Sequence, residues 1–139
     1  KKIKMNQEKS KKNKQEKYLE LQMLSSQYQK LDQQLQALEN QILELLALDN
    51  NLLDLSSIKG DTEILVPFGS GILVPASLKN SKNLLVNVGS NTIVEKDVSQ
   101  SREIVKRQVK ELEKIQMQYQ GEISKLGVSM QILQEELTK

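Results

Sequence analysis

The chain contains no histidine, cysteine or tryptophan, and its 139 residues include only two prolines and one phenylalanine. Without histidine and cysteine it lacks the commonest general bases, reactive thiols and soft metal ligands, and it cannot form a disulfide. The absence of cysteine fits a reducing, cytoplasmic setting. The longest apolar runs have four or five residues, too short for a membrane span or a signal-peptide core. Because aromatic residues make up only 3% of the chain, a large globular core is not expected.

Two long runs, one toward each end of the chain, carry apolar residues at alternating steps of three and four. This spacing of 3.5 residues is the heptad pattern of a coiled coil. Each run has ten such positions, nine of them apolar. The first set is Leu21, Leu24, Tyr28, Leu31, Leu35, Leu38, Ile42, Leu45, Asp49 and Leu52. The second set is Val105, Val109, Leu112, Gln116, Tyr119, Ile123, Leu126, Met130, Leu133 and Leu137.

The two runs predict an antiparallel helical hairpin within one chain. If the chain folds back, seam positions pair at residue numbers that add up to 157 or 158, as in Leu24 with Leu133 and Leu52 with Val105. An alternative is two separate amphipathic helices on a globular core. Such helices usually carry a wider apolar stripe, so the narrow seam favours the two-stranded coil.

The sequence patterns predict four segments along the chain: an arm at 1–17, a first helix at 18–55, strands at 56–98 and a second helix at 99–139. Ser99 is the expected N-cap of the second helix, with Ser101 as the rival. Gly121 and Gly127 lie inside that helix, where each costs about 1 kcal/mol relative to alanine. Local flexibility and simple tolerance both explain them.

The arm at 1–17 is rich in lysine. It holds eight lysines and two glutamates, which leaves 12 of the 20 basic and 16 of the 18 acidic residues for the rest of the chain. A basic arm can bind nucleic acid, but this one has no arginine and no aromatic residue for stacking on bases. We therefore expect a solvated tail or a helix extension.

The middle of the chain predicts two β-hairpins. Residues 62–68 and 72–78 flank Gly-Ser-Gly, and residues 83–88 and 92–97 flank Gly-Ser-Asn. Glycine and asparagine supply the positive φ angles of short turns. A phosphate-binding loop would instead open directly into a helix, and neither turn does so.

Both faces of the predicted strands are partly apolar, since Leu65, Leu73 and Leu85 alternate with the other apolar positions. Isolated hairpins are marginally stable in water, so these strands should pair with other subunits in an intersubunit β-barrel. The expected oligomerisation residues are Ile64, Val66, Phe68, Ile72, Val74, Leu84, Val86, Val88 and Val94. Pro67 and Pro75 cannot donate in a strand ladder and belong at edges, bulges or strand ends.

The amino-acid sequences of the two hairpins, ILVPFGSGILVPASL and LLVNVGSNTIVEKDV, resemble those of the prefoldin family, as does the order of helix, two hairpins and helix. The resemblance covers about residues 18–138. Beta-type subunits of that family have one hairpin, so two hairpins point to the alpha type. The lysine-rich arm has no counterpart in the family pattern.

The resemblance implies an ATP-independent holdase: two alpha and four beta subunits joined by a β-barrel platform, with coiled coils that capture unfolded proteins for a group II chaperonin. Clients would bind at the coil tips, where Leu19, Met23 and Ile132 are apolar residues outside the seam. They are equally well explained as scattered surface residues or as e and g positions that flank the seam. The full expected client-binding set is Tyr18, Leu19, Met23, Leu24, Met130, Ile132, Leu133 and Leu137.

Other functions are less favoured by the residues. Catalysis and a cofactor or metal site are not expected, because a two-stranded coil has no concave pocket in which pKa values are shifted. Asp49 and Gln116 are polar residues in the seam, and such residues typically fix the register of the two helices in a coiled coil. The main alternative is a coiled-coil adaptor that binds nucleic acid through the arm, but it leaves the apolar hairpins without a role.

Overall fold

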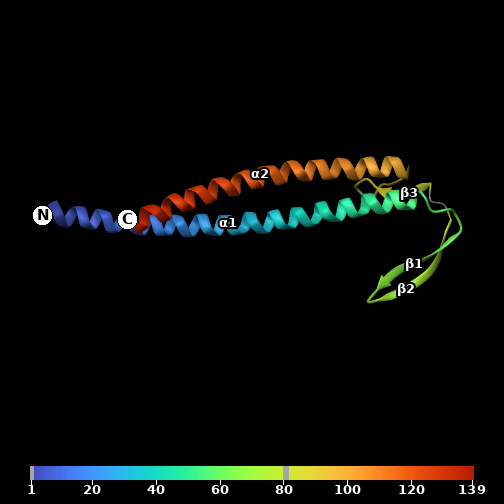
Figure 1. Cartoon of the computed structure of the whole chain (residues 1–139), viewed down its shortest axis with the longest axis horizontal. Helices are drawn as coiled ribbons and strands as arrows, with labels where there is room; N and C mark the ends of the chain where they lie inside the picture. Colours follow the sequence, from blue (N-terminus) through green and yellow to red (C-terminus); the bar gives the residue numbers. More distant parts are fainter. Residues whose placement is uncertain (1, 80–81) are drawn as a thin grey trace. The chain divides into compact units, whose positions relative to one another are not determined.

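The computed structural model describes the backbone of residues 2–79 and 82–139 and the side chains of residues 13–79 and 82–139. In chain order the elements are α1 (Lys2–Leu55), β1 (Thr62–Gly69), β2 (Ile72–Leu78), β3 (Asn83–Asn87), β4 (Ile93–Asp97) and α2 (Val98–Thr138), as Figure 1 shows. The chain forms two compact units: a terminal unit of Lys1–Gln41 with Leu112–Lys139, and a central unit of Ile42–Glu111. Because α1 begins at Lys2, the backbone of the arm is helical from Lys2 onward, while the side chains of residues 1–12 lie outside the described part.

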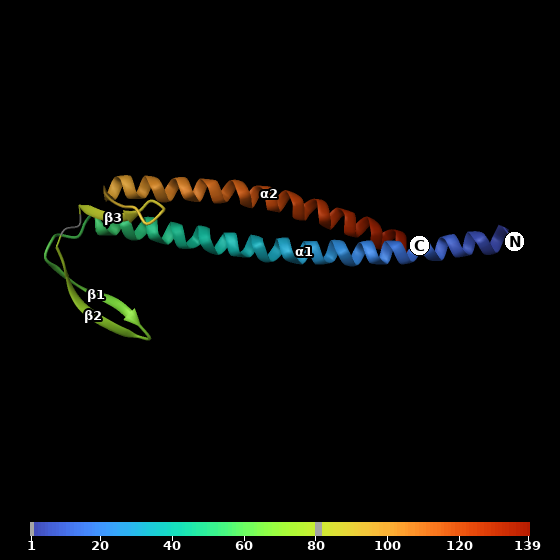
Figure 2. The same cartoon turned by 180° about the vertical axis from the view of Figure 1, so that it is seen from behind.

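In the terminal unit, α1 and the last part of α2 run side by side in opposite directions, and the start of α1 extends beyond the end of α2, as both views show (Figure 1, Figure 2). Lys17 near one end of the chain forms an ion pair with Glu136 near the other, with 3.2 Å between Nζ and Oε2. Further along, Tyr28 lies beside Gly127. These contacts establish the antiparallel direction of the two helices.

In the central unit, the end of α1 meets the start of α2 with the same antiparallel direction. Asp49 of α1 accepts hydrogen bonds from Arg102 of α2. The residue numbers of the three contacting pairs in the two units add up to values between 151 and 155, below the 157 or 158 expected of seam partners. Lysine, tyrosine and arginine are long, so these contacts set the direction of the helices and leave the layer-by-layer register as a prediction.

Burial follows the predicted seam. All twenty seam positions are buried or half-buried, and most residues between them are exposed. The four buried apolar residues of the described chain are all seam residues: Ile42, Val105, Val109 and Leu133. The helices therefore pack along a narrow line and not on a globular core.

Strands β1 and β2 form the first antiparallel hairpin, with Val66 opposite Val74. The register shifts between Pro67 and Gly69, which leaves Phe68 in a β-bulge. Ser70 and Gly71 have φ angles of 48° and 80°, so the two-residue turn has the left-handed backbone that hairpins prefer.

Pro67 and Pro75 lie opposite Leu73 and Leu65 across this ladder. Proline has no N–H, so these pairs are positions where the backbone donors point away from the partner strand. Both edges of the ribbon thus lack one donor.

Strands β3 and β4 form the second hairpin, with Val86 opposite Val94. Ser90 and Asn91 have φ angles of 50° and 59°, and the N–H of Thr92 donates to the carbonyl of Gly89 at 2.9 Å. The predicted turn chemistry is confirmed in both hairpins.

The N-cap of α2 is Asp97, so the expectation of Ser99 or Ser101 is wrong. The N–H of Gln100 donates to Asp97 Oδ1 at 2.7 Å, and the N–H of Asp97 donates to Gln100 Oε1 at 3.2 Å. This is a reciprocal capping box. An aspartate with a glutamine three residues later satisfies two backbone donors, which neither serine does here.

Candidate functional site

Four predicted client-binding residues of the terminal unit are exposed apolar side chains. Tyr18, Leu19 and Met23 on α1 and Ile132 on α2 have exposed fractions between 51% and 65%. They therefore present apolar area to solvent near the ends of the chain.

The other four predicted client-binding residues are covered. Leu24, Met130 and Leu137 are half-buried and Leu133 is buried, because they are seam residues of the helix pair. These four residues therefore offer a client much less apolar surface than the four exposed ones.

The first hairpin exposes apolar residues on both faces. Val66, Ile72 and Val74 of the predicted assembly set are exposed, and so are Leu65 and Leu73 on the opposite face. Phe68, at the bulge, is 79% exposed, the highest value among the large apolar residues described. Ile64 is half-buried and Val88, after β3, is exposed.

The second hairpin has one covered face. Leu84, Val86 and Val94 alternate as half-buried residues along β3 and β4. Val86 lines a groove of about 660 Å³ together with Ile104 of α2, so this face is turned toward the chain's own helix. This face therefore borders the chain's own α2, and its pairing with other subunits stays a prediction.

The exposed face of the second hairpin carries Leu85 and Ile93, at 73% and 62% exposed. They lie on the face opposite to Val86 and Val94. The predicted oligomerisation residues did not include Leu85 or Ile93. The alternation of side chains along a strand shows that the strand has two faces, but it does not show which face the rest of the chain covers.

A paired charge lies in the seam of the central unit. Arg102 donates from Nε to Asp49 Oδ1 at 2.9 Å and from Nη2 to Oδ2 at 3.4 Å, and the side chains are 26% and 15% exposed. Mainly because Arg102 donates to it, the pKa of the Asp49 carboxyl lies below its usual range, although burial opposes the shift. The same hydrogen bond raises the pKa of Arg102. The arrangement is a fork-like pair that favours one alignment of the helices.

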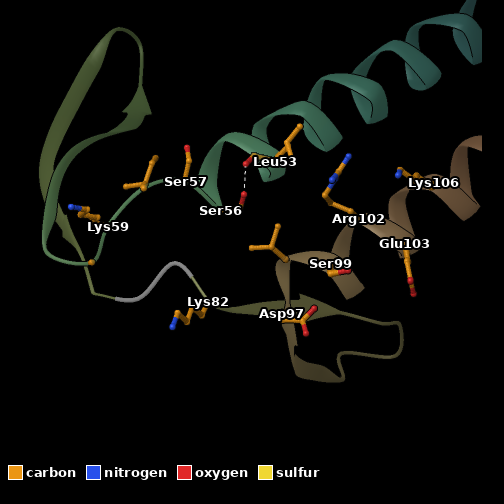
Figure 3. A pocket seen from close by; sticks show the side chains of 13 residues that line it. Leu53, Ser56, Ser57, Lys59, Lys82, Asp97, Ser99, Arg102, Glu103 and Lys106 are labelled. Atoms are coloured by element: carbon orange, nitrogen blue, oxygen red, sulfur yellow. Dashed lines mark hydrogen bonds between the residues drawn. The ribbon is translucent and has the colours of Figure 1, made fainter.

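A groove of about 850 Å³ opens in the central unit (Figure 3). The end of α1 contributes Leu53, the following loop contributes Lys59, and α2 contributes Arg102 and Lys106. Its acidic residues are Asp97, which caps α2, and Glu103. Ser56 and Ser57 donate to carbonyls of the last turn of α1. Three side chains of this groove, those of Ser56, Ser57 and Asp97, thus take part in ending one helix and starting the other.

Among the side chains of residues 13–79 and 82–139, no group of three or more acidic residues is placed to hold a metal ion. In the described part of the chain, no helix has the length and apolar content to cross a membrane.

The geometry defines a class of protein: two long antiparallel helices in a narrow coiled-coil seam, joined by two exposed β-hairpins. Residues 24–139 match the family described as Prefoldin subunit, and the chain belongs to the prefoldin family. A chain in the cryo-EM structure of filamentous PFD from Methanocaldococcus jannaschii has the same fold, with a TM-score of 0.74 and 21% sequence identity. The alignment covers 84% of this chain and 96% of that chain. A search of curated proteins found no match.

Family membership gives the chain a chaperone-type role, since prefoldin is a family of non-enzymatic chaperones.

Proposed function

We propose that the chain is an alpha-type prefoldin subunit: an ATP-independent holdase that captures unfolded proteins and delivers them to a group II chaperonin in the cytoplasm. The observation that carries the proposal is the exposure of Tyr18, Leu19, Met23 and Ile132 in the terminal unit. Large apolar side chains exposed on a helix pair with no globular core are suited to binding other apolar chains.

The alpha assignment rests on the strands. The chain has two separate two-stranded hairpins between its helices, where beta-type subunits are expected to have one. Both hairpins leave apolar residues in solvent, and two-stranded hairpins are marginally stable alone. Assembly with four beta subunits and a second alpha subunit in a β-barrel would cover these residues and remove the free strand edges.

Capture would depend on several weak contacts. Each exposed tip residue offers a small apolar area and no deep pocket, so one site binds a client weakly. Several subunits that contact one extended client raise the effective concentration of the remaining contacts. Methionine at position 23 suits irregular partners because its side chain is flexible and polarisable.

The test is to replace Tyr18, Leu19, Met23 and Ile132 together by serine and to measure suppression of light scattering by a heat-denatured client, without nucleotide and with a beta-type partner. The matched control replaces Leu43 and Met117 by serine as well; these residues are 63% and 72% exposed and lie at other places on the helices. We expect the fourfold variant to lose most of the suppression and the control to keep it. Equal loss in both would mean that capture has no preferred place on the helices.

The alternative function, an adaptor that binds nucleic acid through the arm, is tested by deleting residues 1–17. For a holdase, the deletion changes capture little and alters mainly its salt dependence. If the intact chain instead binds DNA tightly, with strong salt dependence, and suppresses no aggregation, the adaptor replaces the holdase.

A further inference from the structure

Methionine carries all the sulfur of this chain. Because the sequence has no cysteine and no tryptophan, its four methionine thioethers are the side chains that peroxides oxidise most easily. Met5 lies outside the side chains that the structure describes, which leaves Met23, Met117 and Met130. A dissolved oxidant reaches a thioether from solvent, so the exposure of each methionine decides how readily it reacts.

The three described methionines differ in exposure. Met23 on α1 is 65% exposed and Met117 on α2 is 72% exposed, whereas Met130 is a half-buried seam residue. The helix pair therefore shields Met130 and leaves the other two open to an oxidant. Of these two, only Met23 belongs to the predicted client-binding set.

The surroundings of Met23 give its oxidation a consequence for binding. Leu19 lies four residues earlier on α1, so the two side chains share one face of the helix. They are 61% and 65% exposed and form a small apolar surface outside the seam. Oxidation to the sulfoxide turns a flexible apolar side chain into a polar one and places an S=O group in this surface. A client that buries this oxygen without a hydrogen bond to it loses affinity.

We propose that Met23 is a site of reversible oxidation by hydroperoxides, and that its sulfoxide weakens client capture. The inference rests on the proposed holdase function. Capture uses several apolar contacts, so oxidation of one of them lowers affinity in steps and does not abolish it.

The chemistry of the switch is a two-electron oxygen transfer in each direction. The thioether sulfur attacks the terminal peroxide oxygen, an S–O bond forms and the O–O bond breaks. The proton of the transferred hydroxyl passes to the leaving oxygen, which departs as an alcohol, or as water when the oxidant is hydrogen peroxide. In the reverse direction, a thiol-dependent sulfoxide reductase returns the oxygen as water while two thiols become one disulfide.

The experiment treats the chain, assembled with its beta-type partner, with hydrogen peroxide and removes the excess with catalase before the client is added. Peptide mass spectrometry follows the sulfoxide at each methionine, and we expect Met23 and Met117 to oxidise faster than Met130. Light scattering gives the amount of protein needed for half-maximal suppression of client aggregation. This amount should rise about fivefold on oxidation, equivalent to about 1 kcal/mol for one apolar contact, and sulfoxide reductase with dithiothreitol should reverse the rise.

Two variants assign the effect to one residue. Met23→Leu removes the thioether from the client-binding set, and Met117→Leu is the matched control at the other exposed methionine. Each protein is compared with its own untreated sample, so that an effect of the substitution itself cancels. Peroxide should have little effect on capture by Met23→Leu and should weaken capture by Met117→Leu as much as capture by the unchanged chain. An equal loss in Met23→Leu would place the sensitive residue elsewhere and overturn the inference.

The remaining outcomes separate this inference from the holdase function. Oxidation of Met23 no faster than that of Met130 would show that exposure does not select the site. Full oxidation of Met23 with unchanged capture would show that the sulfoxide is not a switch. Either result overturns the inference and leaves the holdase function standing. If the untreated chain captures no client, the holdase function fails, while the relative oxidation rates still decide whether Met23 is the modified residue.

Discussion

Removal of one hydroxyl group should stabilise the protein. Ser101 of α2 is only 5% exposed, and among the described residues no hydrogen-bond partner lies within reach of its Oγ. A buried hydroxyl without a partner costs about 1–3 kcal/mol. Serine is also a poorer helix former than alanine, by about half a kcal/mol. Both terms favour Ser101→Ala.

The expected gain for Ser101→Ala is about 1–2 kcal/mol, because the small void left by the oxygen offsets part of the benefit. For a chain of this length that corresponds to a rise in Tm of about 3–6 °C. The measurement is thermal and urea unfolding followed by far-ultraviolet circular dichroism, at several protein concentrations because assembly also stabilises the chain.

The matched control is Ser99→Ala, two residues earlier in the same helix and exposed. It changes helix propensity alone, so its gain should stay below about half a kcal/mol. If Ser101→Ala destabilises the protein, or gains no more than the control, the hydroxyl has a partner in the assembled protein and the reasoning is refuted.

Three further predictions concern the helix pair. Asp49→Asn should lower the unfolding midpoint above about pH 4 and lose this effect as the pH falls toward 2. Because the pKa of Asp49 is lowered in the folded protein, its pairing with Arg102 stabilises the fold at pH values above the pKa of an unfolded aspartate. This stabilisation is lost as the pH falls through the pKa of Asp49 in the folded protein, so a difference between variant and unchanged chain that does not vary with pH would contradict the prediction. Asp97→Ala should cost about 1 kcal/mol in urea unfolding through loss of the helix cap, and a neutral result would mean that Ser99 takes over. Cysteines at Leu24 and Leu133 should cross-link within one chain on oxidation; links between chains would indicate a parallel dimer.

The elements of this fold could be predicted from local patterns. The alternating steps of three and four fixed all twenty seam positions, because a coiled coil buries one narrow line of each helix. The glycine and asparagine of the two turns located both hairpins, because these residues accept positive φ angles more readily than most others. Such signals depend on residues close in sequence, so they can be read without a structure.

The candidate site was only half predictable. The sequence marked Leu19, Met23 and Ile132 as apolar residues outside the seam, and they are exposed. It also marked Leu24 and Leu133, which the helix pair covers. Heptad spacing identifies apolar side chains at a helix end but does not show which of them solvent or a client can reach.

The sequence by itself determined that two helices form a narrow antiparallel seam with two hairpins between them. Only the tertiary structure decided three contacts within that framework: the pairing of Asp49 with Arg102, the bulge at Phe68, and the groove that Val86 lines together with α2. These features join residues far apart in the chain or depend on how two strands align. Periodicity along one segment specifies the face that is buried, and the partner on that face is chosen only when the segments meet in space.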